Sequence, residues 1–376
     1  MSDPQSEGDV QIAPELKALF ENMNRAKASD LHLKAGLPPH LRIQGEVHPM
    51  AAEPVTSEQI EHMAVSLMDA RQTEMFATTG NVDVAYELPH GDRFRANVFR
   101  QRGTAAMAVR RVSRNIPDIE SLHLPASIHA ISQSAQGLIL LAGPTGSGKS
   151  TTIASMIEHI NKTKACHILT LEDPIEYLYE SKLALVSQRE IGIDVADFAM
   201  GLKYMTREDP DVVLIGEMRD HETFQAALQA SETGHLVFGT IHASTAYQTI
   251  GRVLDLFPSD QRDRVRQSLS FNLRAIICQK LLPSIKPGIP RIPAVEVMIS
   301  NPSVRQMIAE GRDADLLEVI VSHEVDGMQT FTKSLLDLIE GELIDPKVAY
   351  ENASNVDELK MRLRGISSSR AGLRGR

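Results

Sequence analysis

The spacing of apolar residues changes near residue 125 and divides the chain into two parts. In the first part, residues 13–26 (APELKALFENMNRA) and 58–68 carry apolar side chains at helical spacing, and the second run follows the capping residues Thr56 and Ser57. Shorter runs alternate apolar and polar residues as strands do, at residues 29–34, 41–49, 81–88, 93–101 and 104–112. A turn at residues 90–92 is expected between the third and the fourth of these strands. These elements predict a small α/β domain at residues 13–113.

In the second part, continuous apolar runs are separated by amphipathic stretches of helical length. The strand candidates are residues 137–143 (GLILLAG), 166–172 (CHILTLE), 212–218 (VVLIGEM) and 235–242 (HLVFGTIH). Apolar strands that alternate with helices are typical of a mostly parallel sheet covered on both faces. Further along, the pattern predicts an irregular hairpin and then three helices, at residues 283–299, 302–311, 314–321 and 331–340. We therefore predict an α/β core at residues 126–366.

The ends of the chain and the junction between its two parts have a different composition. Residues 1–12 are polar and are expected to be disordered, and the small, polar and basic residues 367–376 are expected to form a flexible tail. The proline spacing of residues 114–125 predicts a linker.

Charge and composition exclude several classes of function. The chain has 376 residues and a net charge of −10, from 39 basic and 49 acidic residues, which argues against non-specific binding of nucleic acid. Trp is absent and aromatic residues make up 4%, so there are few platforms for stacking bases. Every apolar stretch is far shorter than the roughly 20 residues that cross a bilayer, and the acidic start does not resemble a secretory signal. We expect a cytoplasmic protein that does not insert into the membrane directly.

The two cysteines do not indicate a metal site or a disulfide. Cys166 and Cys278 both lie in apolar runs, and neither has a CxxC partner. We expect both to be small residues of the core.

One segment carries the complete signature of a phosphate-binding loop. Residues 143–150 (GPTGSGKS) match G-x-x-x-x-G-K-[ST], with an apolar strand before them and an amphipathic helix after them. Glycines let backbone N–H groups converge on phosphate oxygens, the lysine reaches the β and γ phosphates, and the following hydroxyl reaches Mg²⁺. The segment predicts a nucleoside triphosphate bound by Gly143, Pro144, Thr145, Gly146, Ser147, Gly148, Lys149, Ser150 and Thr151.

Carboxylates follow two of the predicted strands. Glu217 is the first acid after residues 212–216, a strand expected to lie beside the strand of the loop, and it is suited to act as a general base or near metal-bound water. The alternative is an ordinary solvated strand end. Glu172, Asp173 and Glu176 follow residues 166–171, and Pro174 is expected to turn these acids outward, either toward Mg²⁺ or as a merely acidic loop.

Histidines and arginines provide further candidates. His235 and His242 flank one strand seven residues apart, so in a regular strand they face opposite sides, and each is either a nucleotide contact or a packing residue. Residues 93–114 hold seven arginines, and strand alternation puts Arg93 and Arg95 opposite Phe94. These arginines either form a solvated face paired with acids or reach a nucleotide.

Four of these segments, in this order, resemble a known family. Residues 143–151 (GPTGSGKST), 171–177 (LEDPIEY), 207–220 (REDPDVVLIGEMRD) and 232–244 (ETGHLVFGTIHAS) are similar to the Walker A, Asp box, Walker B and His box of the type II/type IV secretion ATPases. Within that superfamily the chain most resembles the type IV pilus retraction ATPases. The resemblance extends to residues 28–47, 93–99 and 327–344 and so covers nearly the whole chain.

The resemblance implies a RecA-like P-loop NTPase core with a smaller PAS-like α/β N-terminal domain, assembled as a homo-hexamer. ATP and Mg²⁺ would bind between the two domains, with an adjacent subunit completing each site. Roles carried over from the family are phosphate binding for Lys149, a catalytic Walker B acid in Glu217, an Asp-box acid in Glu176, His-box positions at His235 and His242, and phosphate contacts from Arg95 and Arg110. The Mg²⁺ side of the site would comprise Ser150, Glu176 and Glu217. The implied partners are a platform protein at the inner-membrane base of the pilus and a paralogous retraction ATPase.

Three segments leave the branch of the family open. Residues 303–308 read SVRQMI where main retraction ATPases carry AIRNLI, so Arg305 is kept and the two residues after it differ. Glu208 and Asp209 are typical of the main retraction ATPases, whereas residues 351–365 are closer to the accessory ones.

An assembly or secretion ATPase usually has extra N-terminal domains and a four-cysteine zinc module, and this chain has two cysteines. A DNA motor and a non-hydrolysing adaptor are the remaining alternatives.

Overall fold

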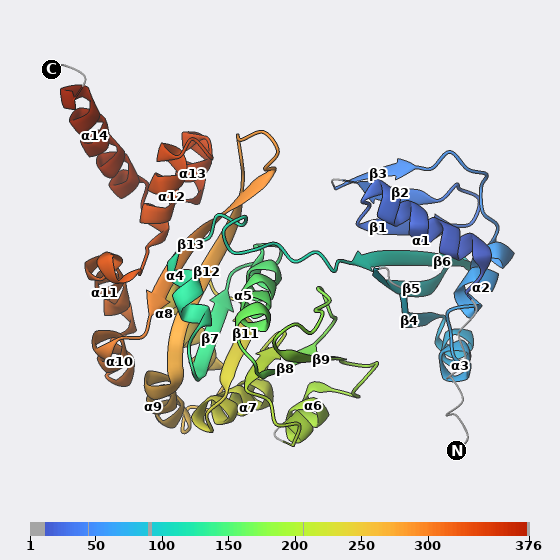
Figure 1. Ribbon diagram of the computed structural model, residues 1–376, viewed down its shortest axis with the longest axis horizontal. Coiled ribbons are helices and arrows are strands. Elements are labelled where there is room, and N and C mark those ends of the chain that lie inside the picture. Colours follow the sequence, from blue (N-terminus) through green and yellow to red (C-terminus); the bar gives the residue numbers. More distant parts are fainter. Residues whose placement is uncertain (1–11, 44, 89–91, 206, 374–376) are drawn as a thin grey trace. The chain divides into compact units, whose positions relative to one another are not determined.

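The structure, a computed structural model, describes residues 12–373 apart from Gln44, residues 89–91 and Thr206, with side chains as far as Gly365 (Figure 1). Except for Ile12, the start predicted to be disordered lies outside the described residues, as do His90 and Gly91 of the predicted turn. The chain forms two compact units, residues 1–115 with 176–178, and residues 116–175 with 179–376. The domain limits given above stay predictions.

The first unit is an antiparallel sheet covered on one face by helices. Six strands lie in the order β3-β2-β1-β6-β5-β4, with bounds Glu46–Pro49, His40–Ile43, Asp30–Lys34, Thr104–Val112, Arg93–Gln101 and Asn81–Glu87. The helices are α1 (Pro14–Ala26), α2 (Ser57–Val65) and α3 (Ala70–Thr79). Phe94 of β5 is fully buried and stacks on Phe20 of α1 with ring centroids 4.2 Å apart. Because side chains alternate along a strand, Arg93 and Arg95 lie on the opposite face, as predicted.

The second unit contains a seven-stranded sheet in the order β13-β12-β7-β11-β10-β8-β9. The bounds are Arg291–Ile299, Leu273–Pro283, Gly137–Ala142, Leu236–Ile241, Val212–Ile215, His167–Glu172 and Leu185–Glu190. All pairs from β12 to β9 are parallel, and β13 alone is paired antiparallel, at the edge. The prediction of a mostly parallel sheet is confirmed, because its central strands are apolar on both faces and wholly buried.

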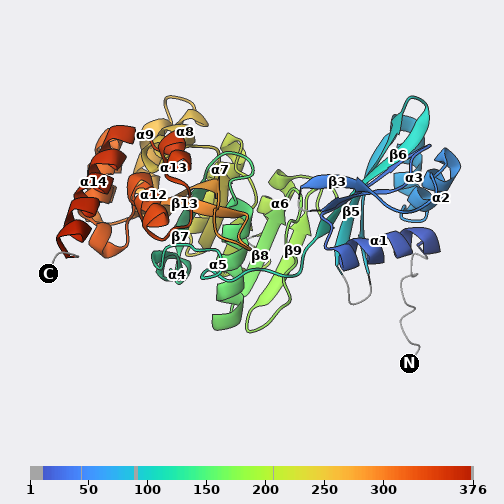
Figure 2. The same cartoon turned by 90° about the horizontal axis from the view of Figure 1, so that it is seen from above.

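Helices cover both faces of this sheet. Alternate residues such as Ile139 and Leu141 pack with α4 (Ser127–Ser132) and α5 (Lys149–Thr163), whereas Leu138 and Leu140 pack with the helices of the opposite face. Those helices are α6 (Phe198–Met205), α7 (His221–Glu232), α8 (Ala246–Asp255) and α9 (Arg262–Asn272). Figure 2 shows α12, α13 and α14 gathered at one end of the unit. The C-terminal helices are α10 (Pro302–Ala309), α11 (Leu316–Ser322), α12 (Phe331–Glu340), α13 (Pro346–Asn352) and α14 (Val356–Leu373), with short 3₁₀ turns at Asp313–Asp315 and Glu324–Asp326.

Three expectations need correction or extension. The strand β10 does not lie beside the loop strand β7, because β11 is inserted between them and pairs in parallel with both. The expected irregular hairpin is a regular antiparallel pair of β12 and β13 that starts at Leu273, since the run LRAIICQKLL is itself a buried strand. The elements α3, α4, β9, α13 and α14 were not predicted, and α14 extends into the expected tail as far as Leu373.

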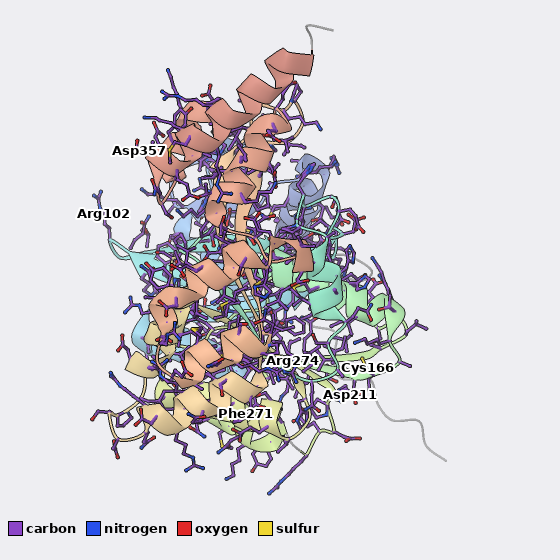
Figure 3. The ribbon with its side chains drawn as sticks, turned by 90° about the vertical axis from the view of Figure 1, so that its left-hand side faces the viewer. Arg102, Cys166, Asp211, Phe271, Arg274 and Asp357 are labelled. Carbon is purple, nitrogen blue, oxygen red and sulfur yellow. The ribbon has the colours of Figure 1, made fainter. Side chains whose placement is uncertain are left out.

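The two cysteines are free thiols in different surroundings. Cys278 of β12 is fully buried, and burial raises the pKa of its thiol well above the ordinary value. Cys166 lies just before β8 and is only partly buried, on the side of the unit where Asp211 is also found (Figure 3). Cys278 is therefore a core residue as predicted, whereas Cys166 packs at the margin of the core.

Candidate nucleotide-binding site

The loop between β7 and α5 has the backbone that phosphate binding requires. Gly143, Gly146 and Gly148 have φ angles of 150°, 77° and 91°, in a region that residues other than glycine rarely adopt. At two of them space is also missing: a Cβ on Gly143 would lie 2.5 Å from the backbone oxygen of Gln279, and one on Gly148 would lie 2.6 Å from its side-chain Nε2. The backbone of β12 therefore leaves no room for a side chain at Gly143, whereas at Gly148 the end of the Gln279 side chain would have to move.

Polar groups around the loop hold it and give it a positive end. Lys149 Nζ donates to the carbonyl oxygens of Gly143 (2.8 Å) and Pro144 (3.0 Å), so its ammonium lies against the loop. Ser150 and Thr151 lie in the first turn of α5, whose N–H groups and dipole favour an anion at this end. Thr152 Oγ1 donates to Gln279 Oε1 at 2.8 Å, which joins α5 to β12. The arrangement is suited to bind the phosphates of a nucleotide.

Glu217 and His242 meet at the carboxyl edge of the sheet. The two residues follow the adjacent parallel strands β10 and β11, so their side chains emerge at the same edge. His242 Nε2 lies 3.0 Å from Glu217 Oε1, and Arg219 Nη2 donates to Glu217 Oε2 at 2.5 Å. The hydrogen bond from Arg219 lowers the pKa of Glu217 against the opposing effect of burial. Glu217 is therefore held as a carboxylate at neutral pH.

The glycine that precedes Glu217 also has a packing reason. A Cβ on Gly216 would lie 3.3 Å from the Cα of Glu172 and 3.3 Å from the backbone oxygen of Leu171, on the neighbouring strand. The carbonyl of Gly216 accepts a hydrogen bond from Thr240 Oγ1 at 2.6 Å. Glycine lets the end of β10 lie close to β8, and this close packing determines the position of the Glu217 backbone.

A cleft of about 910 Å³ connects the loop with His242. Its walls come from the loop, from the segment after β11, from α8 and from β12. The lining residues outside the loop include His242, Ala243, Ser244, Tyr247, Gln248, Arg252, Gln279 and Lys280. Because His242 lines the cleft and is hydrogen-bonded to Glu217, the carboxylate is linked to the same space as the phosphate loop.

His235 is not brought to this cleft. It precedes β11 at the amino end of the strand, roughly 20 Å from the carboxyl end where His242 lies. Its Nδ1 lies 2.9 Å from the carbonyl of Ala230 and 3.1 Å from Thr233 Oγ1, at the end of α7. Within this unit His235 is a helix-end residue.

The Asp-box acids are separated rather than turned outward together. Glu172 is buried at the end of β8, where Thr170 Oγ1 (2.7 Å) and Gln188 Nε2 (3.1 Å) donate to it. The expectation that Pro174 turns all three acids outward is therefore wrong for Glu172, because these two donors satisfy it inside. Glu176 belongs to the short segment grouped with the first unit, in which Leu178 N donates to Ser113 O at 3.2 Å.

Arg95 and Arg110 face each other across β5 and β6 in the first unit. Like charges directly opposite each other destabilise a sheet unless anions balance them. Asp30 is buried and accepts from Arg110 Nε at 2.9 Å, and Asp83 Oδ1 lies 3.9 Å from Arg95 Nη2. The side chain of Arg110 is nevertheless 76% exposed, so an anion can approach it.

With this geometry the chain can be compared with known proteins. The family model of the type II/IV secretion system protein matches residues 5–327. The chain belongs to this family. It is 42% identical over 326 residues to the type IV pilus retraction ATPase PilT of Pseudomonas aeruginosa, which covers 87% of this chain and 94% of that protein.

Two further relatives cover most of the chain. The type IV pilus ATPase PilU of the same organism is 35% identical over 357 residues, or 95% of this chain and 93% of PilU. A crystal structure of the pilus retraction motor PilT with bound ADP has a TM-score of 0.84 and 43% identity, covering 91% of this chain and 98% of the other. The predicted fold class, a RecA-like core with a smaller α/β domain, is confirmed by this match.

The donor set fits Mg²⁺ that arrives with a nucleotide. The hydroxyl of Ser150, in the first turn of α5, and the carboxylate of Glu217 are oxygen ligands of the kind that Mg²⁺ prefers together with phosphate oxygens and water. The metal-binding role of Glu176 stays a prediction. Within the described part of the chain, no group of three or more His, Cys, Asp or Glu side chains is placed to hold a metal ion. Mg²⁺ coordination by phosphate oxygens and only one or two protein groups agrees with this donor set.

Sequence reasoning missed the contribution of β12 to the site. Gln279 and Lys280 line the cleft, and Gln279 contacts the loop as described above. The available signal was a polar pair inside the apolar run AIICQKLL, in a strand that was not predicted.

Among the described residues, no helix combines the length and apolarity needed to cross a membrane.

Proposed function

We propose that this chain is an ATP-hydrolysing motor that works as a homo-hexamer and powers the retraction of type IV pili, the basis of twitching motility. The observation that carries the proposal is the meeting of Glu217 and His242 at the sheet edge next to a complete phosphate loop. The similarity to PilT supports the same function over 94% of that protein's length.

In the proposed reaction, water attacks the γ-phosphorus of ATP and the bond from that phosphorus to the β-γ bridging oxygen breaks. Lys149 and the N–H groups of the loop bind the phosphates, and the Glu217 carboxylate accepts a proton from the attacking water. Arg219 keeps that carboxylate ionised, and His242 orients its Oε1. Arg95 and Arg110 neutralise charge on the phosphates of a site completed by another domain or subunit. Ser150, Glu217 and Glu176 are the residues proposed to hold Mg²⁺, which would supply positive charge to the phosphates.

Mechanical work follows from contacts that exist only while the γ-phosphate is bound. Such contacts favour a closed arrangement of domains, and hydrolysis removes them, so the balance between closed and open states shifts by their differential binding energy. Around a ring of six copies, successive closures would drive the pilus machinery. The proposed location is the cytoplasmic side of the inner membrane, at a platform protein of the pilus base, with no role for nucleic acid.

A second candidate function is that of an accessory retraction ATPase beside a paralogous main motor. Two observations favour it: the match to PilU covers 95% of this chain, and α10 carries SVRQMI where the main motors carry AIRNLI. The phosphate loop and Glu217 are the same in both cases. What distinguishes them is whether the chain retracts pili alone.

The proposal is tested by producing the chain in a piliated strain that lacks its retraction ATPases. Restored twitching with the wild-type chain, and none with E217Q, is the expected result. Restoration only when a main retraction ATPase is also present would establish the accessory function. No restoration in either background, with the protein produced and pili present, would contradict a function in retraction.

A further inference from the structure

A carboxylate outside the proposed chemistry connects the nucleotide cleft with the C-terminal helices. Glu296 lies in the middle of β13, is 4% exposed and faces Cys278 of β12. Its Oε1 accepts a hydrogen bond from the backbone N–H of Ala246 at 2.7 Å, and the carboxylate also accepts from the backbone N–H of Phe331. Burial of a charged group is costly unless it is paired, and here two N–H donors supply the pairing.

Both donors are the first residues of helices. Ala246 begins α8 and Phe331 begins α12, so each N–H belongs to the positive end of a helix. One side chain therefore stabilises the starts of two helices that are far apart in the sequence. Burial raises the pKa of Glu296, and the two backbone hydrogen bonds oppose that rise.

The bond to Ala246 anchors the segment that carries His242. Residues 242–245 connect the end of β11 to the start of α8, and His242, Ala243 and Ser244 line the cleft. One end of this segment is held by the ladder of β11. The other end is held by Ala246 on Glu296. The position of His242 beside Glu217 thus depends on both anchors.

The bond to Phe331 leads to the C-terminal helices. Ser334 of α12 accepts from Val295 N at 3.0 Å, next to Glu296 on the same strand. Lys280 Nζ lies 4.9 Å from the ring centroid of Phe331 and donates to the carbonyl of Asn352, the last residue of α13, at 2.9 Å. Lys280 and Asn352 both line the cleft, so α12 and α13 are connected to its wall.

We propose that Glu296 is a positioning residue for the nucleotide site, which fixes the His242 segment through Ala246 and makes its position depend on the start of α12. This inference rests on the proposed ATPase function for its effect on turnover. The positional link itself does not, because it is a property of the nucleotide-free protein. A change at the start of α12, such as one produced by a docking partner, would then change the position of His242.

The test compares E296Q with the control S334A in the full-length chain. In E296Q a neutral amide with one acceptor oxygen replaces the charged carboxylate, so the hydrogen bonds to the two N–H groups are weakened with little change in volume. S334A removes a buried bond between α12 and β13 and leaves the Ala246 anchor in place. The readouts are hydrogen exchange of the Ala246 amide without nucleotide, kcat and KM for Mg-ATP, and Tm.

E296Q is expected to raise Ala246 exchange by about tenfold and to lower kcat by about tenfold, with KM changed by less than about twofold. S334A is expected to lower Tm by a similar amount and to leave Ala246 exchange and kcat as in the wild type. Wild-type exchange and kcat in E296Q, or an equal loss of kcat in S334A, would overturn the positioning role. If the wild type does not hydrolyse ATP at all, the proposed function fails, and the exchange result alone decides the link.

The dependence on α12 has its own variant. Thr330 caps α12 by accepting from Lys333 N at 3.2 Å, directly before Phe331. T330A loosens that first turn, so we expect faster exchange at the Ala246 amide than in S334A. Identical Ala246 exchange in T330A and in the wild type would overturn the link to α12.

Discussion

Glu217 has a different partner on each of its carboxylate oxygens: His242 Nε2 at 3.0 Å on Oε1, and Arg219 Nη2 at 2.5 Å on Oε2. His242 reaches it because β11 lies between the loop strand β7 and the strand β10 that precedes Glu217. The histidine is thus between the phosphate loop and the carboxylate along the sheet edge. This arrangement leads to predictions for the acid, the loop and the arginines of the first unit.

Removal of Arg219 should shift the pH dependence of turnover. The pKa of Glu217 is lowered chiefly by the hydrogen bond from Arg219, so the ionised base persists to more acidic pH than an ordinary glutamate. In R219A the pKa rises toward that of an ordinary glutamate, and the acidic limb of kcat should move to higher pH, measured from about pH 3 to pH 8. R219K keeps a positive charge, so it should lower the pKa of Glu217 in part and place the limb between those of R219A and the wild type. An unchanged limb in R219A would show that Glu217 is not the group that titrates.

Lys149 should be needed for nucleotide binding, unlike a lysine further along the same helix. K149A removes the ammonium that lies against the loop carbonyls, and we expect at least about a tenfold loss in affinity for a fluorescent ATP analogue. K162A is the matched control, since Lys162 lies in the last turn of α5 and pairs with Glu158 at 3.3 Å. Equal affinity in the two variants would contradict the phosphate-binding role of the loop.

Strand β5 carries a control residue for Arg95 on its opposite face. Arg95 lies on the polar face of β5, whereas Arg100 packs over the Phe76 ring at 5.0 Å and pairs with Glu61 at 3.0 Å. R95A should lower kcat by about tenfold or more with Lys149 intact, because it removes charge that stabilises the transition state. R100A should reduce Tm slightly and leave kcat unchanged. Full activity in R95A would return Arg95 to a solvated sheet face paired with Asp83.

Two loop glycines should differ in what alanine does to them. In G143A the Cβ meets the backbone oxygen of Gln279 at 2.5 Å, so β12 or the loop must move and nucleotide affinity should be lost. In G146A no atom lies within 4 Å of the new Cβ, so only the cost of the left-handed backbone remains, about 1 kcal/mol in the free energy of unfolding. Chemical denaturation and nucleotide titration of both variants measure the contrast. Equal behaviour would mean that β12 does not press on the loop.

Local and contiguous patterns could be predicted from the sequence. The phosphate loop is one unbroken segment between a strand and a helix, and the alternation of Arg93, Phe94 and Arg95 assigns their faces directly. The parallel sheet followed from apolar strands that alternate with helices. The branch of the family and the roles of individual site residues stay predictions.

Relationships between distant segments could not be predicted. Gln279 lies 127 residues from its partner Thr152, and the order of strands that inserts β11 beside β7 is set by packing rather than by sequence order. Glu172 was expected to face outward because a proline follows two residues later, whereas Gln188 of β9, an unpredicted strand, satisfies it inside. For His235 the seven-residue spacing indicated the opposite side of the strand, and the direction of β11 places it at the far end.

The central claim is tested most directly by steady-state Mg-ATP turnover of the purified chain, measured on a fraction whose mass is determined by light scattering. We predict a mass six times that of the chain, and turnover that falls by about 10² to 10⁴ in E217Q with binding of the ATP analogue retained. E222Q, an exposed glutamate in the first turn of α7, should match the wild type. A monomer that binds the analogue without turnover, or full turnover in E217Q, would contradict the account.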